Sequence, residues 1–182
     1  MGITAVGCTT IFTSIPEPSH EETPHPVREE HIKEGVDGAS NQNKKCGVGL
    51  VIHLNSHRSL KASVGLGIAT NNFVELSALK LLLSWLIDLG IPTIQIFGDS
   101  MNIIKWFNGI SRFQNYILSP LLEDTKHLKS LFNEFSLCHI YREHNNTTNQ
   151  LSKAGLQQDL GSWRIEESDM DVIRVSNLPP SA

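Results

Sequence analysis

The sequence predicts an α/β fold in which a sheet that starts with a hairpin is covered by helices. Two stretches rich in glycine and β-branched residues, 46–54 and 60–70, flank the turn-forming segment 55–59 and predict that hairpin. Residues 71–90 follow with leucines at helical spacing and end in a glycine, which predicts a long helix. Short strands and helices then alternate, so the expected element order is β-β-β-α-β-α-α-β-α.

The elements after the long helix are shorter. They are an apolar strand at 93–98, a short helix opened by Ser100, a helix at 118–135 with Pro120 at its first position, a strand at 136–141 and a last helix at 146–156. In the 118–135 helix we expect Leu121, Leu128 and Leu131 to share the buried face. The first strand is expected at 31–36, although Glu34 interrupts its alternation.

The two ends differ in composition from the middle of the chain. Residues 1–30 contain four prolines and few large apolar residues, which predicts a disordered leader. We expect the folded domain to span 31–160 and a tail to occupy 161–182. The whole chain of 182 residues carries a formal charge of −4, but 37–157 holds eleven Lys and Arg against eight Asp and Glu. The overall acidity therefore does not exclude a nucleic-acid partner for the middle segment.

The cysteines and the hydropathy pattern exclude several classes. Cys8, Cys46 and Cys138 form no CxxC pair, so neither a zinc knuckle nor a disulfide framework is indicated. No apolar run reaches the ~20 residues of a membrane span, and no basic residue precedes Arg28 to start a signal peptide. We therefore expect an intracellular protein, cytoplasmic or nuclear, with no membrane partner.

Three acids stand at the ends of predicted elements. Asp37 closes the first strand, Glu75 lies in the first turn of the long helix, and Asp99 ends the strand at 93–98. Taken singly, such residues are turn formers, caps or helix-dipole partners. Together, at the carboxyl ends of neighbouring strands, they would repel one another unless a cation neutralised them. Hard oxygen ligands without His or Cys suit Mg²⁺ or Mn²⁺.

Four motifs follow one another along the chain: "DGAS" (37–40), "TNNFVE" (70–75), "GDS" (98–100) and "REHN…NQLSK" (142–153). In this order and spacing they resemble the type 1 ribonuclease H domain, in the branch found in plant retroelements and their derivatives. The resemblance covers about 35–157. It implies a ribonuclease H-like fold with a five-stranded mixed sheet flanked by helices. It also implies cleavage of the RNA strand of RNA–DNA hybrids with two Mg²⁺ ions, for which Mn²⁺ can substitute.

By this resemblance, Asp37, Glu75 and Asp99 are three of four catalytic, metal-binding acids, and the fourth falls on Asn149. An asparagine keeps a carbonyl oxygen that can bind a hard cation, but it lacks the negative charge. One hypothesis is an enzyme with weakened metal binding. The other is a nucleic-acid-binding module that has lost catalysis.

The resemblance also implies contacts with the hybrid. The residues concerned are Gly38, Asn43, Thr70, Asn71, Asn72 and Ser100. The alternative for Asn71 or Asn72 is helix capping, and Lys44 and Lys45 are either phosphate contacts or solvated turn residues. His144 is a candidate for assisting water or product exchange, although a surface-loop role is favoured, and His139 is expected to be structural. The expected partner is an RNA–DNA hybrid, and the expected state is a monomer.

Overall fold

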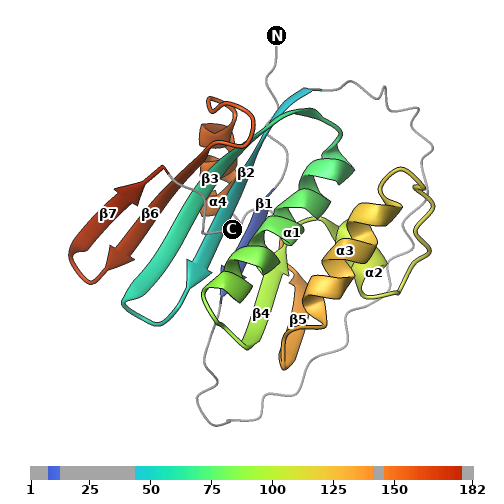
Figure 1. Ribbon diagram of the computed structural model, residues 1–182, viewed down its shortest axis with the longest axis horizontal. Helices are drawn as coiled ribbons and strands as arrows, with labels where there is room; N and C mark the ends of the chain where they lie inside the picture. The colour runs from blue at the N-terminus through green and yellow to red at the C-terminus, as the bar shows by residue number, and fades with distance from the viewer. Residues whose placement is uncertain (1–7, 13–43, 142–145, 178–182) are drawn as a thin grey trace.

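The computed structural model of the protein describes residues 8–12, 44–141 and 146–177 (Figure 1). The elements in chain order are β1 (Cys8–Phe12), β2 (Lys44–His53), β3 (Arg58–Ala69), α1 (Asn71–Asp88), β4 (Thr93–Gly98), α2 (Met101–Phe107), α3 (Ser119–Lys129), β5 (Glu134–His139), α4 (Asn146–Gly155), β6 (Trp163–Asp169) and β7 (Val172–Ser176). The predicted α/β class is confirmed. Within the described ranges, no helix is long and apolar enough to cross a membrane.

The described strands form one mixed sheet in the order β5-β4-β1-β2-β3-β6-β7. The β2–β3 hairpin is antiparallel and β4 runs parallel to β5, whereas β1 runs parallel to β2 and antiparallel to β4. In Figure 1 the helices α1, α2 and α3 lie in front of the sheet and α4 lies behind it. The sheet is therefore the middle layer of three.

The described residues contribute seven strands to the sheet, whereas five were expected. The strand expected at 31–36 lies outside the described residues, and β1 comes from the segment 1–30 that was expected to be disordered. A strand in the middle of a sheet favours a continuous run of β-forming residues. The sequence CTTIF of β1 meets that requirement, whereas 31–36 contains Lys33 and Glu34.

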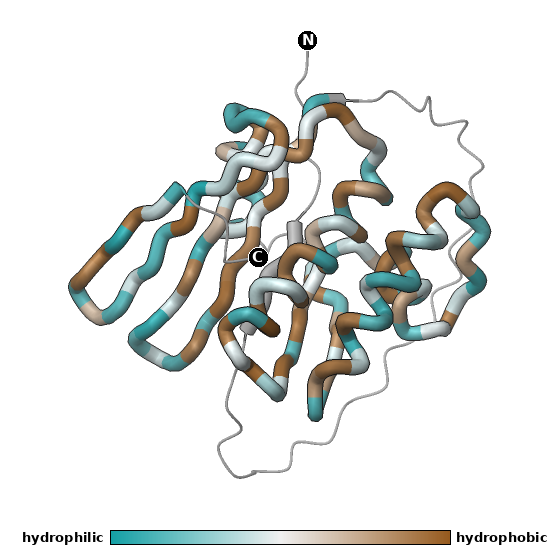
Figure 2. The backbone as a smooth tube through the Cα atoms, viewed as in Figure 1, coloured by the Kyte–Doolittle hydropathy of each residue, from teal (hydrophilic) through white to brown (hydrophobic). Residues whose placement is uncertain are grey.

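The core forms between α1 and one face of the β2–β3 hairpin. Alternate residues of β2 such as Leu50 and Ile52 are fully buried, as are Leu79 and Leu83 of α1. Figure 2 shows this as brown, hydrophobic stretches along β2 and α1, whereas the tip between β2 and β3 is teal. Burying such side chains contributes about 1.5–3 kcal/mol each, so α1 is held mainly by packing.

The face of α3 that contacts the core differs from the expected one. Leu122 and Thr125 are buried, whereas Leu121 and Leu128 are only half-buried and Leu131 is exposed. The helix ends at Lys129, so Leu131 lies past its last turn and the helical spacing no longer applies to it. On its outer side α3 is tied to α1 by the ion pair of Lys80 with Asp124, whose Nζ and Oδ2 atoms lie 2.8 Å apart.

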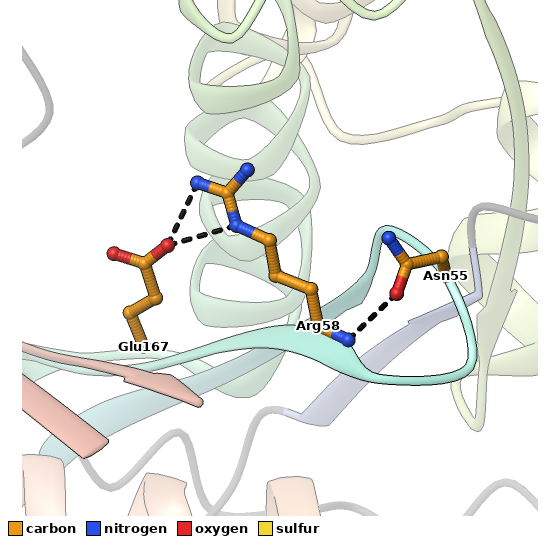
Figure 3. A network of polar contacts seen from close by, with 3 residues as sticks. All are labelled: Asn55, Arg58 and Glu167. Atoms are coloured by element: carbon orange, nitrogen blue, oxygen red, sulfur yellow. Dashed lines mark hydrogen bonds and ion pairs between the residues drawn. The ribbon is translucent and has the colours of Figure 1, made fainter. Parts of the chain in front are cut away.

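The C-terminal hairpin β6–β7 was not expected from the sequence, which predicted a tail at 161–182. Trp163 of β6 is buried and meets Trp85 of α1 edge to face, with ring centroids 5.9 Å apart. At the other end of β6, the Nε and Nη2 atoms of Arg58 lie 2.8 and 2.7 Å from Oε1 of Glu167 (Figure 3). The alternation of WRIEESD and the β-branched run VIRVS were the available signals for these strands.

The helix α4 approaches the back of the sheet more closely than side chains would allow. A Cβ atom on Gly49 of β2 would collide with the carbonyl oxygen of Thr148 and would lie 2.8 Å from the Cβ of Leu151. Gly47 and Gly65 meet the backbone of the segment 152–159 in the same way. None of these glycines has a positive φ, so space and not backbone conformation requires them.

The substitution Gly49→Ala is therefore expected to lower the free energy of unfolding by about 3 kcal/mol, because α4 must shift away from β2. Chemical denaturation checks this. The matched control is Gly98→Ala in β4, where the new Cβ would come no closer than 3.9 Å to Ile104 Cδ1, an ordinary contact. Equal loss of stability in both variants would contradict the role given to close α4 packing.

Candidate functional site

The start of α1 carries the predicted hybrid-contacting triplet. Thr70 is the N-cap, and its hydroxyl oxygen accepts a hydrogen bond from the backbone N–H of Phe73 at 3.4 Å. The N-cap is therefore Thr70. The alternative, in which Asn71 or Asn72 caps the helix, is wrong. Asn71 is exposed and Asn72 half-buried, in the first turn. Because the backbone N–H groups of a helix start are directed outward, this turn can present donors to phosphate.

Glu75 is the fifth residue of α1, so it lies beyond the first turn in which it was expected. A role as a simple helix-dipole partner is weakened by that position, because the dipole effect is confined to the end of the helix. Glu75 is half-buried and lines a small pocket together with Gly98 and Ser100. The start of α1 and the end of β4 therefore meet.

Asp99 lies between Gly98 and Ser100 at the carboxyl end of β4, where the chain turns into α2. Asp99 is half-buried, and its Oδ1 oxygen is shielded from solvent. Ser100 is the N-cap of α2, but its side chain makes no capping hydrogen bond. The structure therefore brings Glu75 and the segment 98–100 together at one edge of the sheet.

The floor of the pocket is apolar, and sequence reasoning did not assign its residues to the site. Leu79 of α1, Ile103 and Ile104 of α2 and Leu137 of β5 line it. Of these, only Leu79 belongs to the leucines at helical spacing that predicted the long helix. The signal that Leu79, Ile103 and Ile104 also support a site is their position one turn after Glu75 or Ser100.

Asn149 lies in the first turn of α4, on the other side of the sheet from α1. It is half-buried, between the fully buried Thr148 and Ser152, and its backbone carbonyl oxygen accepts a hydrogen bond from the Ser152 hydroxyl at 2.9 Å. Asn149 is not among the residues that line the pocket of Glu75. Its position is set by the close packing of α4 on Gly49.

Asp37, Gly38, Asn43 and His144 lie outside the described residues, so their predicted roles stay predictions. The place beside β4, where a strand ending at Asp37 was expected, is held by β1. Because β1 runs antiparallel to β4, its residue Thr9 is level with Gly98, and its start rather than its end adjoins Asp99.

The side chains at this edge are of the kind that binds a hard cation, but the described residues supply too few of them for a complete metal site. Glu75 and Asp99 supply carboxylate oxygens, which Mg²⁺ prefers. Among the described residues, no group of three His, Cys, Asp or Glu side chains is arranged to hold a metal ion. Asp37 would supply the third carboxylate, so the donor chemistry fits the predicted Mg²⁺ ions provided that Asp37 joins this edge.

Two other titratable groups respond to burial. Burial raises the pKa of the Cys46 thiol by more than a backbone hydrogen bond at Ala69 lowers it. Burial, together with the nearby Lys61 ammonium, lowers the pKa of His53. Both groups are therefore held neutral at neutral pH, which makes Cys46 a poor nucleophile.

Solved structures of ribonucleases H1 have the same fold. RNase H1 from the halophilic archaeon Halobacterium salinarum NRC-1 is 21% identical, with a TM-score of 0.51 over 60% of this chain and 93% of that one. The N-terminal RNase H domain of rv2228c from Mycobacterium tuberculosis is 16% identical, with a TM-score of 0.51 over 61% and 97%. LC11-RNase H1 in complex with an RNA/DNA hybrid is 21% identical, with a TM-score of 0.56 over 65% and 91%. The class of the protein is therefore a ribonuclease H-like fold.

Residues 35–155 match the family model described as reverse transcriptase-like. The chain belongs to the reverse transcriptase-like family. The resemblance to a ribonuclease H domain of retroelement type, inferred from the four sequence motifs, is thereby confirmed. The matched segment ends at the last residue of α4, so β6 and β7 lie outside it.

The cap at the start of α1 leads to a stability prediction. Thr70→Ala is expected to lower the free energy of unfolding by about 1 kcal/mol, because the N–H of Phe73 loses its partner. Thr70→Ser keeps the hydroxyl and serves as the matched control. Denaturant titration of both variants checks this, and an alanine variant as stable as the serine variant would argue against the cap.

Proposed function

We propose that this chain is a metal-dependent endonuclease that hydrolyses the RNA strand of RNA–DNA hybrids. The observation that supports this most directly is the meeting of Glu75, from α1, with the segment Gly98–Ser100 that contains Asp99. Open α/β sheets bind ligands at the carboxyl ends of their strands, and the two acids gather there. Membership in the reverse transcriptase-like family and the ribonuclease H fold agree with this function.

The proposed metal ligands are the carboxylates of Asp37, Glu75 and Asp99, with the side-chain carbonyl oxygen of Asn149 as a weaker fourth ligand. Two Mg²⁺ ions bound there would stabilise the charge on the scissile phosphate and lower the pKa of the attacking water. The apolar floor under Glu75, built from residues such as Leu79 and Ile104, keeps the carboxylate from moving into the core. Shielding of the Asp99 Oδ1 oxygen from solvent strengthens its attraction for a cation.

The residues proposed to contact the hybrid surround these acids. Thr70 keeps a hydroxyl proton that its capping bond does not use, because the hydroxyl acts there only as an acceptor. Exposed Asn71 adds amide donors, and Ser100 lines the pocket itself. The half-buried Asn72, together with Gly38 and Asn43, completes the proposed set. Hydroxyl and amide groups of this kind read the 2′-hydroxyls and shape of an A-form-like minor groove without sequence specificity.

A second candidate is a hybrid-binding module without catalysis. Two observations favour it: Asn149 stands at the fourth acid position, and β1 occupies the place beside β4 that a strand ending at Asp37 would need. Such a module would keep the contacts at the start of α1. It would bind hybrid in either the presence or the absence of divalent ions.

The deciding experiment incubates the purified full-length chain with an end-labelled RNA–DNA hybrid, in Mg²⁺ and separately in Mn²⁺. Cleavage of the RNA strand is expected, and Asp99→Asn is expected to lower its rate roughly 100-fold or more. Glu123→Gln is the matched control, because it removes one carboxylate from the exposed side of α3. Hybrid binding without cleavage in either ion would establish the binding module instead.

The fourth position can be tested by adding a charge. Asn149→Asp is expected to lower the Mg²⁺ concentration for half-maximal cleavage about tenfold, because the metal ions gain a carboxylate ligand. It should also enlarge the rise in Tm that Mg²⁺ produces, which is measured without substrate. Gln150→Glu adds the same charge at an exposed neighbouring residue of α4 and is expected to change neither quantity. Equal responses of the two variants would mean that Asn149 does not face the metal ions.

A further inference from the structure

The end of β5 lies beside the candidate acids. His139, the last residue of β5, is in register with Gly98 of β4, and the backbone N–H of Ile140 donates to the Gly98 carbonyl oxygen at 2.9 Å. Because the two strands are parallel, the residues after them leave the sheet at the same edge. Tyr141 therefore emerges next to the turn that contains Asp99.

The ring of Tyr141 is both exposed and held in place. It is 66% exposed, and it meets the ring of His139 edge to face, with centroids 5.6 Å apart and planes at 83°. His139 itself is half-buried against the sheet. An exposed tyrosine with no neighbouring ring would sample several rotamers, whereas this one packs against the His139 ring and still exposes about two thirds of its surface.

Other apolar side chains are exposed at the same edge. Phe73 in the first turn of α1 is 37% exposed, and Met101 at the start of α2 is 40% exposed. Both helices begin at the pocket that contains Glu75 and Ser100. A free cation or a small anion gains no binding energy from apolar side chains around a cluster of acids. A nucleic-acid strand matches it, because that ligand presents phosphates and flat sugar and base surfaces together.

We propose that Tyr141 contacts a sugar or base of the nucleic-acid strand bound at the carboxyl edge of β4 and β5, and that His139 orients its ring. Tyr141 is thus a substrate-contacting residue and His139 a positioning residue. The contact uses the face of the ring and not the phenol hydroxyl. This inference rests on the proposed binding of an RNA–DNA hybrid and adds an aromatic contact to the polar ones.

The test measures the Kd of the full-length chain for a fluorescent RNA–DNA hybrid by anisotropy, without divalent ions, so that cleavage does not occur. Tyr141→Ala is expected to weaken binding about tenfold, a typical effect of losing one stacking ring. Tyr141→Phe, which keeps the ring, should bind within about twofold of the unaltered chain. In Mg²⁺, Tyr141→Ala should raise KM more than it lowers kcat.

His139 is tested by rescue. His139→Ala is expected to weaken binding about threefold by releasing the Tyr141 ring, and His139→Phe, which restores an aromatic edge, is expected to recover it. Tyr116→Ala is the matched control, because Tyr116 is 91% exposed in the segment between α2 and α3. It should bind like the unaltered chain.

Three results would overturn the inference. They are unchanged binding in Tyr141→Ala, an equal loss in Tyr141→Phe, or an equal loss in Tyr116→Ala. If the unaltered chain binds the hybrid and any one of these three results is found, only the inference about Tyr141 is wrong and the proposed function is unaffected. Failure of the unaltered chain both to bind the hybrid without divalent ions and to cleave it in Mg²⁺ or Mn²⁺ would overturn both.

Discussion

The backbone of α4 rests directly on the backbone of β2 and β3, and the geometry behind the sheet follows from that contact. Gly47 and Gly49 leave no side chain between β2 and α4, so the backbone of the buried residues Thr148 and Ser152 lies directly against the strand. Asn149, between them, has little freedom to move along or across the sheet. The place of residue 149, the fourth position of the candidate site, is thus fixed by glycines, which have no functional group in the side chain. A change of charge at residue 149 is therefore expected to leave the placement of the helix unchanged.

Much of the fold was predictable because its signals are local. Hydrophobic periodicity identified α1, and the stretch 93–98 was predicted with the bounds that β4 has. What could not be predicted depends on contacts between distant segments. The C-terminal hairpin is held by Trp163 against Trp85 and by Glu167 against Arg58, and neither partner is recognisable from the local sequence.

The candidate site was predictable to a similar degree. The positions of Glu75 and Asp99 at element ends gave their convergence, because the carboxyl edge of a sheet collects such residues. The strand next to β4 was not predictable. Either 8–12 or 31–36 could fill that place by local sequence, and the choice depends on contacts across the whole sheet. Tyr141 carried no signal in the sequence, because an isolated tyrosine after a strand has no motif. Only the register of β5 with β4 places it beside Asp99.

The contact between Trp85 and Trp163 joins the reverse transcriptase-like segment to the hairpin that follows it. Trp85 belongs to the matched range 35–155 and Trp163 lies beyond it. Two indole rings at this separation couple their electronic transitions, so the pair contributes a circular-dichroism signal that depends on both rings being in place. The protein therefore contains an intrinsic optical reporter of hairpin docking. Loss of that signal before the loss of helical signal would identify the hairpin as a separately opening unit of the fold.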